Sequence, residues 1–387
     1  MHQTLETATS IIRVDLPAVK RNVEKIRRHI GPDTEIIYVA KSNGYGNGIA
    51  APAVYLNREC GIHCFATSQI GEAMELRAAG INDFLMVLSA VPFSAIPKFV
   101  ELGLVATVYD DTFPAALSRE AVRQGKTVKV HIKIDTGLHR IGLPAGAPLA
   151  HLIETLKALP NIEIDGVFTH LANAYSLDKT VTQHQKTLFD AAIAQLHDAG
   201  IYPRMTHMAN TAACVASPEC YYDAVRLAAL VFGHDISPGE QNRLHLELAT
   251  SWRCYVLNTM WVEAGDGISY YRYYVPDHRT HIALVSFGMG DGYIRAAVSP
   301  DIARNADVLI NGHRARLIDL NFDQTFVDIT DVPGEVHIGD TVTIIGKDGD
   351  QEITTTEIAA HANTSNGNVC AAITSRPFRQ YIYSDQD

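Results

Sequence analysis

The first clear pattern along the chain is that of an amphipathic helix. Apolar residues recur at helical spacing from Val19 to Ile30, and Asp15 stands where a helix-capping residue is favoured. A Gly-Pro pair at 31–32 ends the helix. The next residues, Glu35–Val39, form a short, largely β-branched apolar run, which is typical of a buried strand.

This strand is followed by further short apolar runs, with helix-like stretches such as Ile70–Ala79 and Lys186–Ala199 between them. The further runs are Ile62–Ala66, Phe84–Leu88, Leu104–Val108, Val128–Ile134, Ile164–Phe168, Met205–His207 and Ala224–Leu227. Strands that alternate with helices are parallel, and eight such units predict an α/β fold with a closed, TIM-like (β/α)8 barrel. An open doubly wound sheet is the alternative architecture.

Beyond Arg243 the pattern changes to strands joined by turns, with one short helix expected at Thr356–Ala362. The expected strands are Leu246–Asn258, Thr280–Ser286, Arg314–Leu320, Thr325–Ile329 and Thr341–Ile345. We therefore expect two domains, a barrel over residues 1–245 and a mostly β domain over residues 246–387. A length of 387 residues also suits two domains rather than one.

Composition excludes several classes of function. The net charge of −11 offers no basic face for nucleic acid or for an anionic membrane. No apolar run approaches the roughly 20 residues that cross a bilayer, and residues 1–10 do not resemble a signal peptide. The Cys60–Cys64 cluster lacks a second ligand pair at zinc-site spacing, so we expect no metal site and reduced cysteines in a cytoplasm.

Polar residues stand where the expected strands end, and a barrel carries its reactive groups at the carboxyl ends of its strands. These residues are Lys41, Lys133, Asp135, Thr169, His170, His207, Asn210 and Arg226. Together they suit a small anionic cofactor that bears a carbonyl group. A partly desolvated Lys41 should have a lowered pKa and act as a nucleophile, although a salt-bridged lysine at a strand end is the plainer interpretation.

Eight segments in order resemble the motifs of the alanine racemase family, whose members use pyridoxal 5'-phosphate (PLP). The segments are Tyr38–Gly48, Lys133–Gly142, Gly166–His170, His207–Ala213, Val225-Arg226 with Phe232-Gly233, Gly267–Tyr270, Gly290–Arg295 and Phe322–Gln324. The first matches the motif around the lysine that binds the cofactor, except that Asn47 stands where the family has His. The resemblance covers almost the whole chain.

The resemblance implies a (β/α)8 barrel, a β domain joined by a short strand near residues 11–14, and a head-to-tail homodimer with shared active sites. It implies that Lys41 holds PLP as a Schiff base and exchanges a proton at the substrate Cα. Tyr270 of the partner subunit would act on the opposite face, with His170 hydrogen-bonded to it. Taken alone, Tyr270 is one of sixteen tyrosines and would be interpreted as a packed aromatic residue.

The same resemblance places the other groups around the cofactor. Arg226 would face the pyridine nitrogen and leave it unprotonated, since a guanidinium does not readily give up its proton. The remaining contacts to the cofactor, mostly to its phosphate, would come from Tyr45, Asn210, Thr211, Ala228 and Ala229.

The substrate would be bound by Arg140, Phe322 and Lys133. Arg140 resembles the arginine that orients the substrate carboxylate, and Lys133 matches a lysine that is carbamylated in many relatives. Without the motif around it, Arg140 would be interpreted as part of an ion pair.

Several cavity positions depart from the family pattern. Gly367 replaces a tyrosine, Met289 replaces another, Phe322 replaces a methionine, and Ala229 stands where the family has isoleucine. We expect an amino-acid racemase acting on alanine or a related small amino acid; a racemase for a different or bulkier one, such as serine, lysine or ornithine, is the alternative. A decarboxylase lacks support because its glycine-rich and Glu-Pro-Gly-Arg motifs are missing, and a barrel-only PLP carrier would leave the β domain unexplained.

Overall fold

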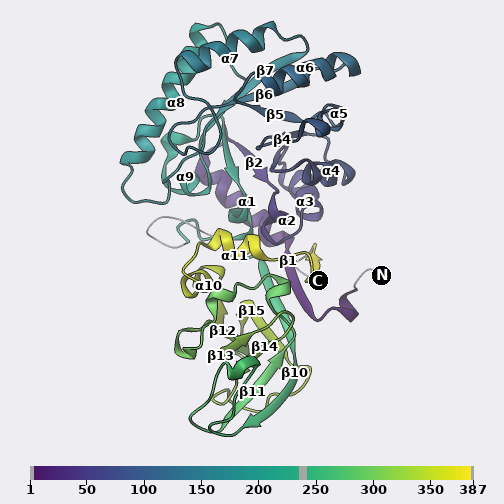
Figure 1. Ribbon diagram of the computed structural model, residues 1–387, viewed down its shortest axis with the longest axis vertical. Coiled ribbons are helices and arrows are strands. Elements are labelled where there is room, and N and C mark those ends of the chain that lie inside the picture. The colour runs from purple at the N-terminus through teal and green to yellow at the C-terminus, as the bar shows by residue number, and fades with distance from the viewer. Residues whose placement is uncertain (1–3, 235–241, 385–387) are drawn as a thin grey trace.

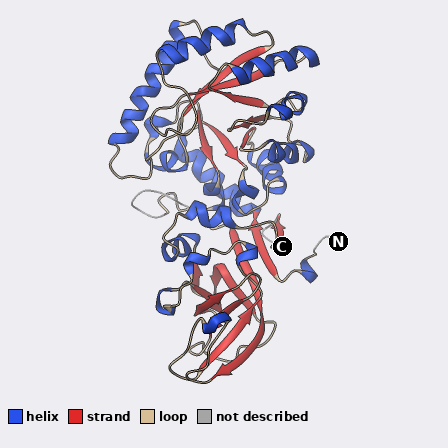
Figure 2. Ribbon diagram, in the orientation of Figure 1, coloured by secondary structure: helices blue, strands red, loops and turns tan. Residues whose placement is uncertain are grey.

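The computed structural model describes residues 4–234 and 242–384 and separates into a barrel and a mostly β region (Figures 1 and 2). Eight parallel strands close on themselves in chain order. They are β2 (Glu35–Val39), β3 (Cys64–Thr67), β4 (Phe84–Val87), β5 (Val105–Val108), β6 (Val128–Lys133), β7 (Ile162–Phe168), β8 (Met205–His207) and β9 (Ala224–Leu227). This closure confirms the barrel and excludes the open sheet.

Helices surround the barrel because each alternates with a strand and buries one apolar face against it. They are α1 (Leu16–Ile30), α3 (Ala50–Cys60), α4 (Ile70–Ala78), α5 (Ile96–Glu101), α6 (Thr112–Gln124), α7 (Ala147–Ala158), α8 (Thr180–Asp198) and α9 (Thr211–Ala216). The first begins where the sequence predicts, since the Asp15 carboxylate accepts a hydrogen bond from Ala18 N at 2.8 Å. None of the helices described has the length and apolar character needed to cross a membrane.

The second sheet has nine strands in the order β16-β15-β12-β13-β14-β11-β10-β1-β17, and β15 also pairs with β10. Their bounds are β1 (Ser10–Asp15), β10 (Thr250–Val262), β11 (Thr280–Val285), β12 (Asp307–Ile310), β13 (His313–Leu320), β14 (Thr325–Asp328), β15 (Thr341–Asp348), β16 (Gln351–Ile353) and β17 (Phe378–Ile382). The N-terminal β1 thus lies antiparallel to β10 and parallel to the last strand, β17. The sequence analysis missed β12, β16 and β17, which are short or lie among polar residues.

Two helices occupy the junction between barrel and sheet. Helix α10 (Thr355–His361) is the helix expected at Thr356–Ala362, whereas α11 (Asn366–Ala372) was not predicted. Ser365 caps α11 by accepting a hydrogen bond from Asn368 N. Figure 1 shows both, in yellow, between the barrel and the β strands, and α11 contacts the short helix α2 (Ser42–Tyr45) beside Lys41.

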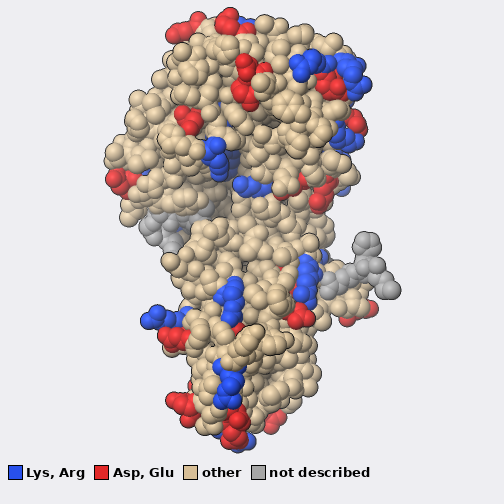
Figure 3. All heavy atoms as spheres, in the orientation of Figure 1, with Lys and Arg blue, Asp and Glu red and all other residues tan. Residues whose placement is uncertain are grey.

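Charged side chains do not gather by sign on the face shown in Figure 3, where basic and acidic groups lie scattered among one another. This face offers no continuous basic surface to a polyanion.

A buried asparagine on α1 connects the first helix to the segment that leaves the barrel. Asn22 is fully buried; its amide donates to Val231 O at 3.1 Å and to Glu247 O at 2.8 Å. Its side-chain oxygen accepts from Glu247 N at 2.8 Å. Because Asn22 satisfies both backbone groups of Glu247, it fixes where the chain enters β10.

We therefore predict that Asn22→Ala lowers the free energy of unfolding by roughly 1–3 kcal/mol, because it leaves buried backbone groups without partners. The urea midpoint measures this loss. Glu24→Ala, an exposed position on the same helix, is the control and should change stability by less than about 0.5 kcal/mol. Equal effects of the two substitutions would contradict the role of Asn22.

Candidate active site

A cavity of about 640 Å³ opens at the carboxyl ends of the barrel strands. It brings together most of the residues that the sequence singles out: Lys41, Tyr45, Lys133, Arg140, His170, Asn210, Thr211, Arg226, Ala228 and Ala229. Gly367 and Asn366, from the start of α11, line it as well. Tyr270 and Phe322 are not among the lining residues of this chain.

Lys41 lies two residues beyond the end of strand β2 and lines the cavity at the mouth of the barrel. Burial lowers the pKa of Lys41, nearby Arg140 lowers it further, and Glu72 opposes both effects. A larger fraction of the amine is therefore uncharged, and thus nucleophilic, at neutral pH than for an exposed lysine.

Glu72 holds the backbone around Lys41 and was missed by the sequence analysis. Its carboxylate accepts hydrogen bonds from Ser42 N at 2.8 Å, Ser68 N at 2.9 Å and Gln69 N at 3.0 Å. It thereby joins the ends of β2 and β3. In the sequence it looks like a first-turn acid on α4, and no local pattern distinguishes it from a solvent-exposed glutamate.

The glycine-rich loop after Lys41 is held by the C-terminal part of the chain. Gly46 has φ +87°, and a Cβ there would lie 2.9 Å from the Cys370 carbonyl oxygen of α11. Arg379 donates from Nη2 to Gly46 O at 3.0 Å. Buried Asn47, at the position where the family has His, accepts from the Thr250 hydroxyl at 2.6 Å. The β domain therefore sets the conformation of this loop.

Arg226 is buried, and nearly all its donors have partners within the barrel. Nη1 donates to His207 Nδ1 at 2.8 Å and to the carbonyl of the same residue, and Nη2 donates to the Thr169 and Met208 carbonyls at 2.8 and 2.9 Å. Burial, then Arg140, lowers the pKa of Arg226 to about 9. Among the described residues Nε–H has no hydrogen-bond partner, so it is available to a group in the cavity.

His170 lies next to Arg226, with Nδ1 at 3.3 Å from Nη2. Burial and the positive charge of Arg226 hold the pKa of His170 well below its usual range, so the imidazole is neutral. A guanidinium only donates, so Nδ1 is the acceptor and Nε2 carries the proton. His170 can therefore donate one hydrogen bond from Nε2.

Lys133 ends strand β6 with its Nζ 4.5 Å from the centroid of the Phe168 ring. Burial first, then Arg226 and Arg140, places its pKa well below the usual range, which favours a neutral amine. The nearby Asp135 carboxylate accepts from the backbone N–H groups of residues 137–139 and so shapes the turn that leads to Arg140.

The cavity lining also carries hydroxyl and backbone donors. The Tyr45 and Thr211 hydroxyls line the cavity, and neither has a hydrogen-bond partner in the part of the chain that is described. The short 3-10 helix Ala229–Phe232 begins here, and the first N–H groups of a helix lack partners within it. Asn210 caps α9 by accepting from Ala213 N at 3.2 Å. These donors suit a phosphate group.

Tyr270 and Phe322 lie on the surface of the β domain, 72% and 75% exposed. The Ser269 hydroxyl donates to the Asp319 carboxylate, which also accepts from Arg295 Nη1 at 2.7 Å. This pair of contacts fixes the backbone immediately before Tyr270, where Ser269 has a left-handed φ of 65°. The tyrosine is therefore presented outwards on an anchored loop.

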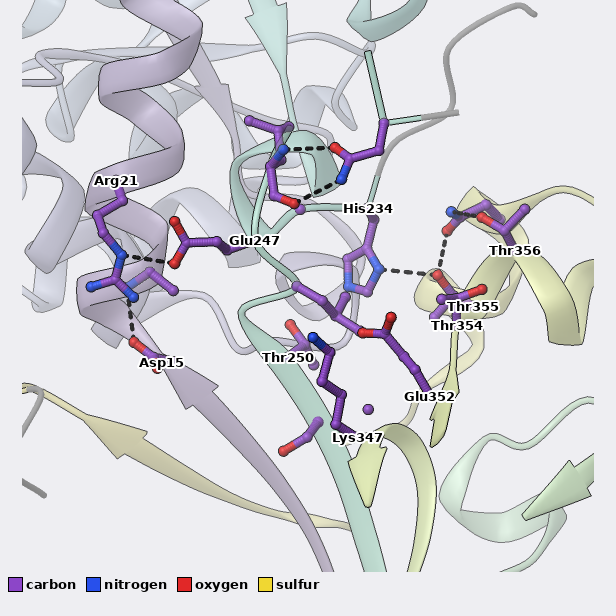
Figure 4. Close-up of a pocket in the computed structure, with 18 of the residues that line it drawn as sticks. Asp15, Arg21, His234, Glu247, Thr250, Lys347, Glu352, Thr354, Thr355 and Thr356 are labelled. Carbon is purple, nitrogen blue, oxygen red and sulfur yellow. Dashed lines mark hydrogen bonds and ion pairs between the residues drawn. The ribbon is translucent and has the colours of Figure 1, made fainter. Parts of the chain in front are cut away.

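A second cavity of about 620 Å³ lies between α1 and the β domain, and none of the predicted site residues lines it. Figure 4 shows Arg21 paired with Glu247 at one side and His234 bonded to Thr355 at the other. Burial lowers the pKa of His234 to about 4. Because the residues of the predicted motifs gather at the barrel mouth instead, that cavity is the stronger candidate for chemistry.

Two family models match the chain. The N-terminal domain of alanine racemase matches residues 14–235, and the C-terminal domain of alanine racemase matches residues 249–381. The second match covers the β domain, which a barrel-only carrier protein would leave unexplained.

Individual proteins agree with the family models. The chain is 36% identical over 370 residues to alanine racemase of Symbiobacterium thermophilum, with 95% of this chain and 96% of the relative covered. It is 32% identical over 377 residues to alanine racemase of Methanococcus maripaludis, covering 96% and 98%. The structure of alanine racemase from Streptomyces lavendulae superposes with a TM-score of 0.90 at 29% identity, covering 98% of each chain. The chain belongs to the alanine racemase family.

Proposed function

We propose that this protein is an isomerase that interconverts L- and D-alanine with PLP as cofactor. The observation that carries the proposal is one cavity that holds the amine of Lys41, with a lowered pKa, and the unpartnered Nε–H of a buried arginine, Arg226. Both curated relatives named above are alanine racemases and cover nearly the whole chain.

The residues of the cavity fit PLP. Lys41 would hold it covalently through its amine, and Arg226 Nε–H would donate to the ring nitrogen. The Tyr45 and Thr211 hydroxyls, together with the backbone N–H groups at Ala228 and Ala229, would bind the phosphate, and Asn210 would contact the cofactor beside them. Once bound, the cofactor withdraws electrons from the substrate Cα and makes its proton removable.

Racemisation needs proton exchange on both sides of Cα, because a single fixed base would favour return to the same side. Lys41 supplies one group. Tyr270 of the partner subunit would supply the other, since Tyr270 of this chain does not line the cavity. The neutral His170, with its proton on Nε2, would donate a hydrogen bond to the tyrosine oxygen. This bond would stabilise the deprotonated tyrosine and so lower its pKa.

The substrate carboxylate would be oriented by Arg140, with Lys133 beside it and Phe322 contributed by the β domain. The neutral amine of Lys133 is the form that reacts with carbon dioxide to give a carbamate. The curated relatives favour alanine as substrate, so the alternative of serine, lysine or ornithine is not favoured, and neither is a decarboxylase. The smaller side chains at Gly367 and Ala229 are too weak an argument for a larger substrate to outweigh these relatives.

The proposal includes a head-to-tail homodimer with shared active sites and a division into residues 1–245 and 246–387. The outward presentation of Tyr270 and Phe322 supports the dimer, because these residues act on substrate only if another subunit brings a cavity to them. The family models divide at 235 and 249, on either side of the proposed domain boundary. A cytoplasmic location stays a prediction of the sequence.

We predict that the purified protein racemises alanine and that Lys41→Ala lowers the rate by at least about a hundredfold, because a positioned proton-transfer group contributes roughly 10²–10⁴-fold. Deuterium exchange at Cα in heavy water across a panel of amino acids measures this. Lys98→Ala, a partly exposed residue of α5 paired with Glu101, is the control and should keep full activity. Carbon dioxide release, or a clear preference for a larger amino acid, would overturn the proposal.

Shared active sites predict complementation between two inactive variants. In a mixture of Lys41→Ala and Tyr270→Phe subunits that have exchanged at random, half of the dimers are mixed and each has one intact site, so about a quarter of wild-type activity should return. Each variant alone stays inactive. If a subunit used its own Tyr270, mixing would restore nothing.

A further inference from the structure

A chain of hydrogen bonds runs through the barrel interior from the candidate active site to the opposite end. Arg226 Nη1 lies 2.8 Å from His207 Nδ1, and His207 Nε2 lies 3.0 Å from His131 Nδ1. His131 Nε2 lies 3.1 Å from an oxygen of Asp165. The side chains of His131 and Asp165 are at most 1% exposed, and the proposed chemistry uses neither.

Arg226 at one end and Asp165 at the other fix the donor and the acceptor of every hydrogen bond in this series. Arg226 can only donate, so His207 Nδ1 accepts and its proton must lie on Nε2. His207 then donates to His131 Nδ1, which leaves the His131 proton on Nε2, pointing at the carboxylate of Asp165. A carboxylate only accepts. As long as both imidazoles are neutral, one arrangement of protons satisfies all three hydrogen bonds, and no other arrangement does.

Both imidazoles are neutral in this arrangement. Burial holds the pKa of His131 below its usual value and that of His207 well below it, although Asp165 opposes the effect at His131. Burial alone would raise the pKa of Asp165, but hydrogen bonds from His131, Arg204 and Lys129 bring it below its usual range. The chain therefore has one positive and one negative end with two neutral rings between them.

Packing holds the two rings in place. The Phe168 ring stacks on His207 with the planes 6° apart and the centroids separated by 4.8 Å. Gly166 faces His131, and a Cβ at this position would lie 2.3 Å from its ring. The strand pairing of β6 and β7 shifts register between Val130 and His131. The glycine of the Gly166–His170 motif thus provides the room that the His131 ring occupies.

Asp165, at the end of the hydrogen-bond series away from the cavity, is held by two cationic side chains. Arg204 donates to both oxygens of Asp165, from Nε at 2.9 Å and from Nη2 at 2.8 Å, and Lys129 Nζ adds a bond at 2.9 Å. Since these contacts fix the carboxylate, the acceptor that faces His131 cannot rotate away. The wrong proton arrangement would place the bare Nε2 of His131 against this carboxylate, which is unfavourable.

We propose that Asp165 and His131 are positioning residues for Arg226: through His207 they keep an acceptor against Nη1 and so leave Nε–H as the donor that faces the cavity. The consequence for catalysis rests on the proposed function, in which this N–H meets the ring nitrogen of the cofactor. If the proton of His207 lay on Nδ1, this N–H would face Arg226 Nη1–H, and the repulsion between the two donors would displace the guanidinium.

The proton positions can be tested directly, without substrate. The full-length enzyme with ¹⁵N-labelled histidine is examined by NMR, and His131 and His207 are assigned from the signals lost in His131→Phe and His207→Gln. We expect both rings to be neutral with the proton on Nε2 between about pH 6 and 9. The charged groups that face the two rings are Arg226, Lys133, Asp165, Arg204 and Lys129. A charged ring, or a proton on Nδ1 of either, would overturn the proposal.

The positioning role is tested with His131→Phe, which keeps an aromatic ring beside Phe84 and Phe168 but breaks the chain. We expect the proton of His207 to be shared between Nδ1 and Nε2 instead of staying on Nε2, and the absorbance band of the bound cofactor to shift. We also expect kcat for alanine to fall roughly 10–100-fold, with KM unchanged within about twofold. Glu154→Gln, an exposed residue of the outer helix α7, is the control and should change none of these.

Gly166→Ala is a second variant that keeps every hydrogen-bonding group but pushes on the His131 ring, and it should reproduce the His207 change. Unchanged His207 signals and an unchanged cofactor band in both variants would overturn the positioning role. If the wild-type protein does not racemise alanine, the proposed function fails, while the NMR result still decides the direction of the chain.

Discussion

The burial of one guanidinium constrains the rest of the site. Arg226 lies inside the barrel, and no carboxylate of the described residues pairs with it. Such a charge is costly unless its donors are satisfied and a counter-charge is connected to it. Carbonyls at the ends of two strands and the His207 ring satisfy all but one donor. The remaining N–H has to face the cavity, and the nearest connected negative charge is Asp165, two imidazoles away.

The same guanidinium tunes its neighbours. Lys133 is buried and His170 is half-buried, and the positive charge of Arg226 disfavours a further positive charge on either. The cavity therefore contains a neutral imidazole and a neutral amine close to a fixed cation, without any metal ligand set among the described residues. His170 and Lys133 therefore add no charge to this cavity, and the charged groups that act on the pKa of Lys41 are Arg140 and Glu72.

Much of the fold could be predicted because hydrophobic patterning is local. Eight short apolar runs alternate with helices, and only a closed barrel or an open sheet accommodates that order. That the polar residues at the strand ends, such as Lys41, Lys133 and Arg226, share one cavity was predictable for a related reason, since the carboxyl ends of parallel strands meet at one face. Tyr45 and Arg140 were indicated only by the resemblance to the family. Helix α11 was missed because Gly367 and polar residues stand where a helix pattern would need apolar ones, and its stability comes from packing on the loop at Gly46.

The sequence by itself determined the alternation of strands and helices, the order of the motifs and the identity of the groups at the strand ends, whereas the structure decided between a closed barrel and an open sheet. Only the tertiary structure decided that Asn22, which the helical pattern places on an apolar face, bonds to the chain at Glu247, and that Glu72 holds the backbone after Lys41. It also decided that His131 points inwards, into space left by a glycine on the neighbouring strand. The partners of Asn22 and His131, at Glu247 and Asp165, are distant in the sequence, so no periodic pattern signals them and only the folded chain brings them together.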